Sequence, residues 1–166
     1  MYKRQAIACQ PRILIADEPT TALDVTVQAR ILNLLRTLAD QGMGILLVSH
    51  DLGVVAQVAD RVAVMYCGSI AETGAVQQMY GNTAHPYTRG LMQASPTMGM
   101  GRSLPQAIPG TVPDFRARPT GCGFSNRCPR AQAICSSGPV AQKSLHPGHV
   151  VACHFPILPT ETAATA

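Results

Sequence analysis

The stretch ILIADEPTTALD, residues Ile13–Asp24, decides how the rest of the chain is interpreted. It opens with a short apolar run, residues 13–16, and two adjacent carboxylates, Asp17 and Glu18, close that run. This composition is typical of a parallel strand buried on both faces, whose last residues carry charge to the carboxyl edge of the sheet. Ligands bind at that edge in open α/β sheets, so the two acids are candidate site residues.

Two carboxylates at the end of a buried strand have a chemical use. One can hold a hydrated Mg²⁺ ion, and the other can accept a proton from an attacking water or orient it. A strand that ends in solvated charge explains the same residues, so the pair alone does not separate a catalytic site from a surface.

A second motif separates the two interpretations. SHD, Ser49–Asp51, lies at the end of another apolar run, Gly44–Ser49, which predicts a second buried strand that delivers His50. A lone histidine after a strand is more often structural than catalytic, but an acid at the matching spacing favours catalysis.

ILIADEPTTALD resembles the Walker B motif and D-loop of ABC-transporter ATPases, and SHD resembles the switch histidine of that family. The helix and strand expected between the two motifs match the family's βαβ arrangement, which implies that His50 reaches the same sheet edge as Glu18. The resemblance implies an α/β fold, the carboxyl-terminal part of an ABC ATPase domain of the P-loop NTPase class.

The resemblance also implies roles for the residues that match. Asp17 would hold Mg²⁺ through water, and Glu18 would polarise the water that attacks ATP. His50 would donate to the γ-phosphate. Asp24 would belong to the D-loop, which in the family crosses to a partner subunit.

Several motifs of the family have no counterpart in this chain. It contains no G-x-x-x-x-G-K-[ST] phosphate loop, no glutamine loop and no LSGGQ-like signature, so we predict negligible ATP hydrolysis by this chain alone. Because the resemblance begins near Ala6, we expect a carboxyl-terminal fragment whose residues 1–5 are a non-native start.

Periodicity and turn residues outline the remaining elements. Apolar residues at helical spacing predict a helix over Thr26–Asp40, and Asp51 is a candidate N-cap for a short helix over 51–59. Further elements are predicted as strands at 61–66 and 69–73, a helix at 75–80 and a helix that is entered through Pro86 and ends before Pro96. The expected organisation is an ATPase part (6–95), an irregular linker (96–121), a four-cysteine metal-binding extension (122–155) and a tail (156–166).

Composition limits the function classes. The chain has 166 residues, 46% hydrophobic and 13% charged, which indicates one modest globular core. It has no apolar run of about 18 residues and no signal-peptide core, so we expect neither a transmembrane segment nor secretion. The net charge of +4 arises after Pro96, with six basic residues against two acidic ones. Without an RNP-like or helix-turn-helix signature, this excess does not predict nucleic-acid binding.

Four cysteines lie in the last third of the chain. Cys122, Cys128, Cys135 and Cys153 have the spacing C-x5-C-x6-C-x17-C, which suits a tetrahedral zinc site or an iron–sulfur cluster. The absence of C-x2-C pairs favours the cluster, and a reducing cytosol argues against disulfides. Arg118, Arg127 and Arg130 would offset thiolate charge.

The remaining cysteines and two histidines have simpler interpretations. Cys9 and Cys67 lie among apolar residues and are predicted to be small core residues. His149 and His154 are candidate substitute ligands, and we interpret them as structural or as neighbours of the ligands.

HPYTRGLMQASP, IPGTVP and GCGFSNRCP with a later CH resemble the carboxyl-terminal extension of ATP-binding subunits of oligopeptide, dipeptide and nickel importers. In those relatives the four cysteines ligate a 4Fe–4S cluster. The resemblance implies ATP and Mg²⁺ as cofactors, with zinc as the alternative to the cluster. It implies a second ABC ATPase subunit, identical or different, two transmembrane permease subunits and, indirectly, a peptide-binding protein. The expected location is the cytoplasmic face of the bacterial inner membrane, as a peripheral subunit.

Two other functions compete with this one. The first is a non-enzymatic iron–sulfur or zinc module that senses metal or redox state, with the α/β part as a scaffold. The second is an ABC ATPase of DNA maintenance, which shares the Walker B and histidine motifs; the HPYT stretch and the four cysteines argue against it.

Overall fold

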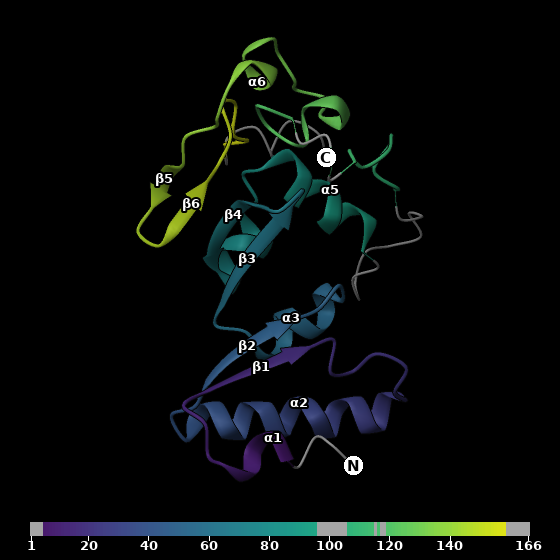
Figure 1. Ribbon diagram of the computed structural model, residues 1–166, viewed down its shortest axis with the longest axis vertical. Helices are drawn as coiled ribbons and strands as arrows, with labels where there is room; N and C mark the ends of the chain where they lie inside the picture. The colour runs from purple at the N-terminus through teal and green to yellow at the C-terminus, as the bar shows by residue number, and fades with distance from the viewer. Residues whose placement is uncertain (1–4, 96–105, 115, 117–118, 159–166) are drawn as a thin grey trace. The chain divides into compact units, whose positions relative to one another are not determined.

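A computed structural model describes residues 5–95, 106–114, 116 and 119–158 of the chain (Figure 1). The chain divides into two compact units, Met1–Ala59 and Asp60–Ala166, called here the first and the second unit. Outside the described residues lie the start at residues 1–4, half of the predicted linker (96–105, 115 and 117–118, which includes Arg118) and the tail from 159. The predicted boundaries at 95 and 121 both fall inside the second unit.

The first unit is a βαβ arrangement preceded by a short helix. Its elements are α1 (Gln5–Ala8), β1 (Ile13–Asp17), α2 (Val25–Asp40), β2 (Gly44–Val48) and α3 (Leu52–Val58). The strands β1 and β2 pair in parallel, from Ile13 opposite Gly44 to Asp17 opposite Val48, and α2 is the crossover between them. The predicted strands and helices of this part are confirmed.

Helix α2 forms where the apolar periodicity places it. The Asp24 carboxylate accepts a hydrogen bond from the backbone N–H of Val27 at 2.9 Å, which caps the first turn. Leu32, Leu35 and Leu38 are the buried residues of the helix. Gly42 follows the last turn with a φ of +94°, a conformation that glycine adopts without strain.

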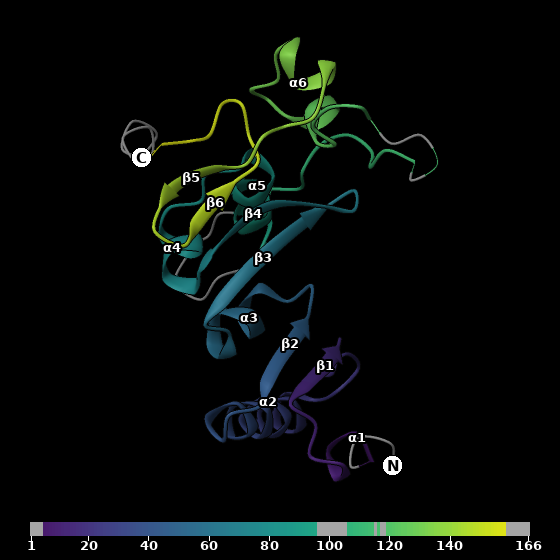
Figure 2. The same ribbon diagram turned by 60° about the vertical axis from the view of Figure 1, so that its left-hand side comes forward.

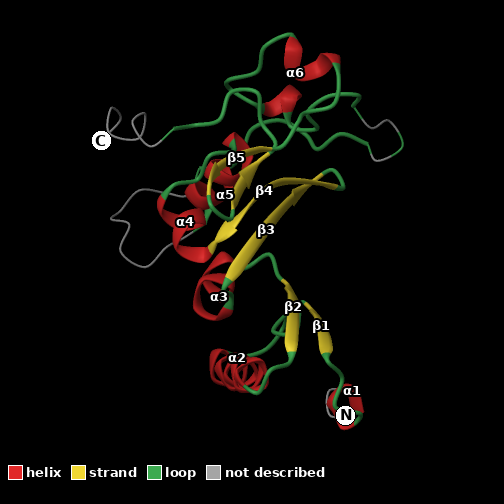
Figure 3. Ribbon diagram, turned by 90° about the vertical axis from the view of Figure 1, so that its left-hand side faces the viewer, coloured by secondary structure: helices red, strands yellow, loops and turns green. Residues whose placement is uncertain are grey.

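The two strands are not buried on both faces, which corrects the prediction for β1. Ile13 and Ile15 are 68% and 67% exposed, and Leu46 and Val48 on β2 are 54% and 45% exposed. The reason is the number of layers: among the described residues of the first unit the sheet has two strands, and α2 packs on one face (Figure 3). The sequence is apolar on both faces, but the described structure covers one.

The second unit is built on a four-stranded antiparallel sheet with the order β3-β4-β6-β5 (Figure 2). Its elements are β3 (Arg61–Tyr66), β4 (Ser69–Ala75), α4 (Val76–Gly81), α5 (Pro86–Ala94), a 3-10 turn η2 (Ser125–Arg127), α6 (Ile134–Ser137), β5 (Lys143–His146) and β6 (His149–Val151). The β3–β4 hairpin and helices α4 and α5 agree with the sequence. Strands β5 and β6 were not predicted; they add residues of the cysteine-rich part to the hairpin's sheet.

Aromatic residues join the hairpin to the chain that follows it. The rings of Tyr66 on β3, Tyr87 on α5 and Phe124 before η2 lie with centroids 4.5 to 5.4 Å apart. Phe124 is 3% exposed and Met79 on α4 is fully buried. This core fixes the start of the cysteine-rich segment against the sheet.

Neither Cys9 nor Cys67 is a core residue, contrary to the prediction. Cys9 is exposed in the turn after α1, and Cys67 is half-buried in the two-residue turn between β3 and β4. Cys67 and Gly68 have φ values of 47° and 73°, as a tight hairpin turn requires, so the turn geometry and not apolar burial sets the position of Cys67.

No helix among the described residues is long and apolar enough to cross a membrane.

Candidate functional site

The carboxyl ends of β1 and β2 bring Glu18 and His50 into contact. His50 Nδ1 lies 2.8 Å from Glu18 Oε1, and the Thr21 hydroxyl donates to Glu18 Oε2 at 2.9 Å. The backbone N–H of Glu18 donates to the carbonyl of Val48, so the turn after β1 remains attached to β2. Glu18 has a φ of 43°, the left-handed region that is costly for a residue with a side chain and is found at functional turns.

The pair is electrostatically coupled. The hydrogen bond from His50, and then the one from Thr21, hold the pKa of Glu18 below its usual value. The hydrogen bond to Glu18 and its charge raise the pKa of His50. Between those two pKa values the contact is a carboxylate–imidazolium pair, and because both side chains are well exposed, solvent screens it.

A pH titration checks this coupling. Because the folded pKa of His50 is raised, the pair's contribution to stability is complete below the usual histidine pKa and is lost as pH rises through the folded value. Glu18→Gln is expected to lower the His50 pKa toward its usual value of 6.5, measured by NMR on the imidazole protons. Asp51→Asn, which removes a smaller contribution, is the control; equal shifts in both variants would contradict the assignment.

The other two acids of the opening motif have different surroundings. Asp17 is the last residue of β1, and its side chain is exposed at the same edge as Glu18. Asp24 caps α2, which gives it a structural role within the first unit. Its predicted contact with a partner subunit stays a prediction.

The four cysteines singled out in the sequence line one small cavity of the second unit. Cys122 lies in a loop, Cys128 follows η2, Cys135 is on α6 and Cys153 follows β6. The segments are held together by a hydrogen bond from the N–H of Cys122 to the carbonyl of Cys135 at 2.8 Å. A Cβ atom at Gly121 would overlap that carbonyl, so this approach requires glycine. The cavity has room for about one water molecule.

The cysteine cavity has donors suited to a soft metal, but they are not arranged as a finished site. Among the described residues, no group of three or more His, Cys, Asp or Glu side chains could hold a metal ion. Burial raises the pKa of Cys122 and Cys128, and that of Cys153 to about 11, so these groups are neutral thiols without a cation. The cavity wall also carries His154, whose Nε2 is buried without a partner. Four cysteine sulfurs and an imidazole nitrogen without a hydrogen-bond partner are ligand types that bind zinc or an iron–sulfur cluster.

Three arginines were predicted to lie near the cysteines and offset their thiolate charge, and the structure places one of them, Arg130, at the cysteine cavity. Arg130 lines the cysteine cavity, whereas Arg118 lies outside the described residues. Arg127 serves another purpose: its guanidinium donates to the carbonyls of Ile108 and Pro109, both at 2.8 Å, and to the Tyr66 hydroxyl at 3.1 Å. It therefore fastens the IPG segment to the β3–β4 hairpin.

Arg127→Ala is expected to release residues 108–111. Loss of two charge-assisted hydrogen bonds to carbonyls should cost about 2 kcal/mol locally, equivalent to roughly 30-fold faster exchange of the amides in this segment. Hydrogen exchange with mass spectrometry measures this. Arg116→Ala, at an exposed position, is the control; unchanged exchange in the Arg127 variant would show that the guanidinium does not hold the segment.

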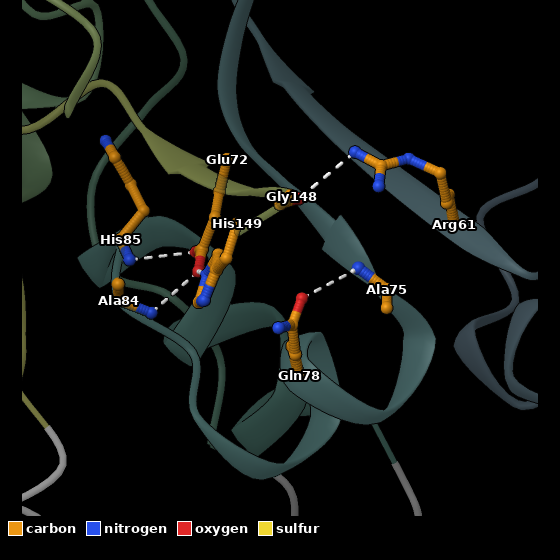
Figure 4. Close-up of polar contacts among 8 residues, drawn as sticks. All are labelled: Arg61, Glu72, Ala75, Gln78, Ala84, His85, Gly148 and His149. Carbon is orange, nitrogen blue, oxygen red and sulfur yellow. Dashed lines mark hydrogen bonds and ion pairs between the residues drawn. The ribbon is translucent and has the colours of Figure 1, made fainter. Parts of the chain in front are cut away.

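Glu72, which the sequence analysis did not single out, lies at the centre of a buried network (Figure 4). Its carboxylate accepts from the backbone N–H groups of Ala84 and His85 and lies 2.8 Å from His149 Nε2. Glu72 is fully buried and His149 is 1% exposed. The network ties β4, β6 and the entry to α5 together. The signal in the sequence is one acid inside the β-run SIAETGA.

Two histidines, His149 and His85, contact the Glu72 carboxylate, His149 through its ring and His85 through its backbone N–H. His149 contacts Glu72 on the sheet, which agrees with its predicted structural role, and its Nδ1 is buried without a partner. His85 begins α5, where its Nδ1 accepts from the N–H of Tyr87 at 3.0 Å. Burial lowers the pKa of His85 to about 4, against the opposing effect of the Glu72 charge.

Comparison with known proteins gives one consistent family. Residues 71–135 match the family model described as "Oligopeptide/dipeptide transporter, C-terminal region". The chain is 48% identical over 151 residues to a probable peptide ABC transporter ATP-binding protein of Sinorhizobium fredii, covering 89% of this chain and 45% of that protein. It is 45% identical over 152 residues to a probable D,D-dipeptide transport ATP-binding protein of Escherichia coli, covering 91% and 46%.

The match extends across both units, from the Walker B-like strand to the cysteine-rich part. A Brucella abortus protein named for ATP binding in peptide import is 50% identical over 157 residues, or 94% of this chain and 47% of that protein. The chain thus spans about half the length of the curated relatives it matches. Over about nine-tenths of its length the chain is therefore similar to ATP-binding proteins of peptide and dipeptide ABC transporters, and its residues 71–135 match the carboxyl-terminal region described for that family.

Proposed function

We propose that this chain supplies the water-activating half of the ATPase site in an energy-coupling subunit of a bacterial peptide importer. The observation that carries the proposal is the 2.8 Å contact between Glu18 and His50 at the carboxyl ends of two parallel strands. Glu18 accepts a hydrogen bond from the attacking water, and His50 donates to the γ-phosphate and steadies both. Asp17, beside them, holds Mg²⁺ through water.

The chain has the residues that would orient the attacking water but not the loop that would hold the phosphates. Catalysis of phosphoryl transfer depends on holding the phosphates as well as orienting the water, and this sequence has no phosphate loop to do so. Productive binding of ATP and Mg²⁺ therefore requires a phosphate loop in addition to the residues of this chain. By itself, the chain has negligible ATPase activity.

A chimera tests the proposal. Residues 6–158 replace the matching region of the Escherichia coli relative, and ATP hydrolysis is measured for the chimera and for the isolated chain. The chimera is expected to hydrolyse ATP and the isolated chain is not. A folded chimera that binds ATP without turning it over would contradict the proposal, and so would turnover by the isolated chain.

The family suggests the assembly in which this site works. The complete subunit pairs with a second ATPase subunit, identical or different, and drives two membrane permease subunits that receive peptide from a binding protein. Its place is then the cytoplasmic face of the inner membrane, as a peripheral subunit. Co-purification of the chimera with the relative's permease subunits is the corresponding measurement.

The second part of the proposal concerns the cysteines. Cys122, Cys128, Cys135 and Cys153 hold a 4Fe–4S cluster, with zinc as the alternative, because four soft donors from separate segments line one cavity. The cavity must widen to admit a cluster. When bound, the group would supply a crosslink between those segments and a redox centre.

Reconstitution tests the cysteine site. The chain is treated with ferrous iron and sulfide under anaerobic conditions, and iron, sulfide and zinc are then quantified with the visible spectrum. Four irons per chain with broad visible absorption support the cluster, whereas one zinc in a colourless protein supports the alternative. Cys135→Ser should lose most of the bound metal; retention equal to the wild type would remove this cysteine from the site.

A further inference from the structure

The hydrogen bonds of His85 show which of its two ring nitrogens carries the hydrogen. The Nδ1 atom accepts a hydrogen bond from the backbone N–H of Tyr87 at 3.0 Å. A backbone N–H can only donate, so Nδ1 has no hydrogen, and the neutral imidazole must carry its hydrogen on Nε2. His85 therefore presents one N–H donor at the far side of its ring.

That donor belongs to the wall of the cysteine cavity. His85 is 3% exposed and lines the cavity together with the four cysteines, Arg130 and His154. Within the described part of the chain, no residue accepts a hydrogen bond from its Nε2. The candidate acceptors on this wall are the Ser125 hydroxyl, the cysteine sulfurs and whatever those sulfurs bind.

The Glu72 network holds the ring in this position. The Glu72 carboxylate accepts the backbone N–H of His85 at 2.8 Å, and in Figure 4 the side chain of His85 extends away from Glu72. The ring also lies 6.1 Å from that of Phe124, centroid to centroid. Backbone, N-cap and ring contacts together leave the imidazole little freedom, so its donor is preorganised.

We propose that His85 is a positioning residue of the cysteine site, whose Nε2–H donates to a ligating sulfur when the cysteines hold their metal group. The inference depends on the metal site put forward under "Proposed function". A hydrogen bond to a ligating sulfur stabilises the more negative state, so it raises the reduction potential of an iron–sulfur cluster. At a zinc site, the same bond would raise metal affinity.

The experiment compares His85→Asn with His146→Asn in the full chain, reconstituted anaerobically with iron and sulfide. Asparagine is a good N-cap residue, so His85→Asn keeps the start of α5 while its shorter amide withdraws the donor. His146 is an exposed residue of β5 and does not line the cavity. The midpoint potential is measured by dye titration with visible and EPR spectra.

The expected result is that His85→Asn shifts the one-electron reduction equilibrium about tenfold, a potential lower by about 59 mV, and that His146→Asn leaves it unchanged. Equal potentials in the wild type and His85→Asn overturn the inference while the metal site stands. A wild-type chain that binds neither iron nor zinc overturns both. If the midpoint potential shifts equally in His85→Asn and His146→Asn, the effect is not specific to His85, and the inference is overturned.

A measurement on the wild-type chain covers the case in which His85→Asn does not fold. The zinc-loaded chain is diamagnetic, and proton-detected ¹⁵N NMR should show a His85 Nε2 proton that exchanges slowly with solvent. Without metal, that proton should exchange at least about tenfold faster, because its acceptor is not yet a thiolate. Fast exchange in both states would overturn the inference.

Discussion

Replacing Glu72 with alanine is expected to lower the free energy of unfolding of the second unit by about 3–5 kcal/mol. The substitution leaves His149 and the backbone N–H groups of Ala84 and His85 buried without their acceptor. Each buried donor that loses its partner costs about 1–3 kcal/mol. Such a loss is a large fraction of the stability of a small unit.

Urea unfolding followed by tyrosine fluorescence measures this loss. Tyr66, Tyr80 and Tyr87 all lie in the second unit, and the chain has no tryptophan, so the signal reports mainly on that unit. Asp114→Ala, which removes an exposed carboxylate from the same unit, should change stability by about 0.5 kcal/mol or less.

A double-mutant cycle separates the Glu72–His149 contact from the rest of the network. If the contact is as tight as its 2.8 Å distance indicates, replacing both residues with leucine should cost less than the sum of the two single changes. A Glu72→Ala variant no less stable than Asp114→Ala would show that the network does not stabilise the unit.

The second large effect is expected on catalysis. In the chimera that carries residues 6–158, Glu18→Gln should lower the rate of ATP hydrolysis at least about 100-fold, because glutamine cannot take a proton from the attacking water. ATP affinity should change little, since Glu18 is placed toward the water and not toward the phosphates. Steady-state turnover and equilibrium nucleotide binding separate the two.

Two further variants make the catalytic test specific. His50→Ala should lower turnover by a similar factor, and the double variant should lose little more, because residues that act as a unit are not additive. Asp40→Asn changes an exposed acid paired with Arg36 on α2 and should leave turnover unchanged. Equal activity in Glu18→Gln and Asp40→Asn would remove Glu18 from the reaction.

The sequence predicted those parts of the fold that local pattern determines. Helix α2 has apolar residues at helical spacing and an acid at its N-cap, and α3 begins at the cap predicted for it, Asp51, which accepts from Gly53 and Val54. The strands predicted at 61–66 and 69–73 likewise form the β3–β4 hairpin.

Strands β5 and β6 escaped prediction because their stability is not local. They are four and three residues long, and β6 pairs with β4, whose paired residues lie 77 and 79 positions earlier in the chain (Thr73 with Val150, Glu72 with Val151). The available signal was the Pro147-Gly148 turn between KSLH and HVV. The role of Glu72 was missed for the same reason, since its partners His85 and His149 are distant in sequence.

The uncovered face of the β1–β2 sheet affects how the purified chain behaves. Ile13, Ile15, Leu46 and Val48 form an aliphatic surface whose attraction to other apolar surfaces grows with kosmotropic salt and weakens on cooling. The chain should therefore bind a phenyl resin in ammonium sulfate and elute earlier at 4 °C than at room temperature, while Ile15→Asp shortens its retention.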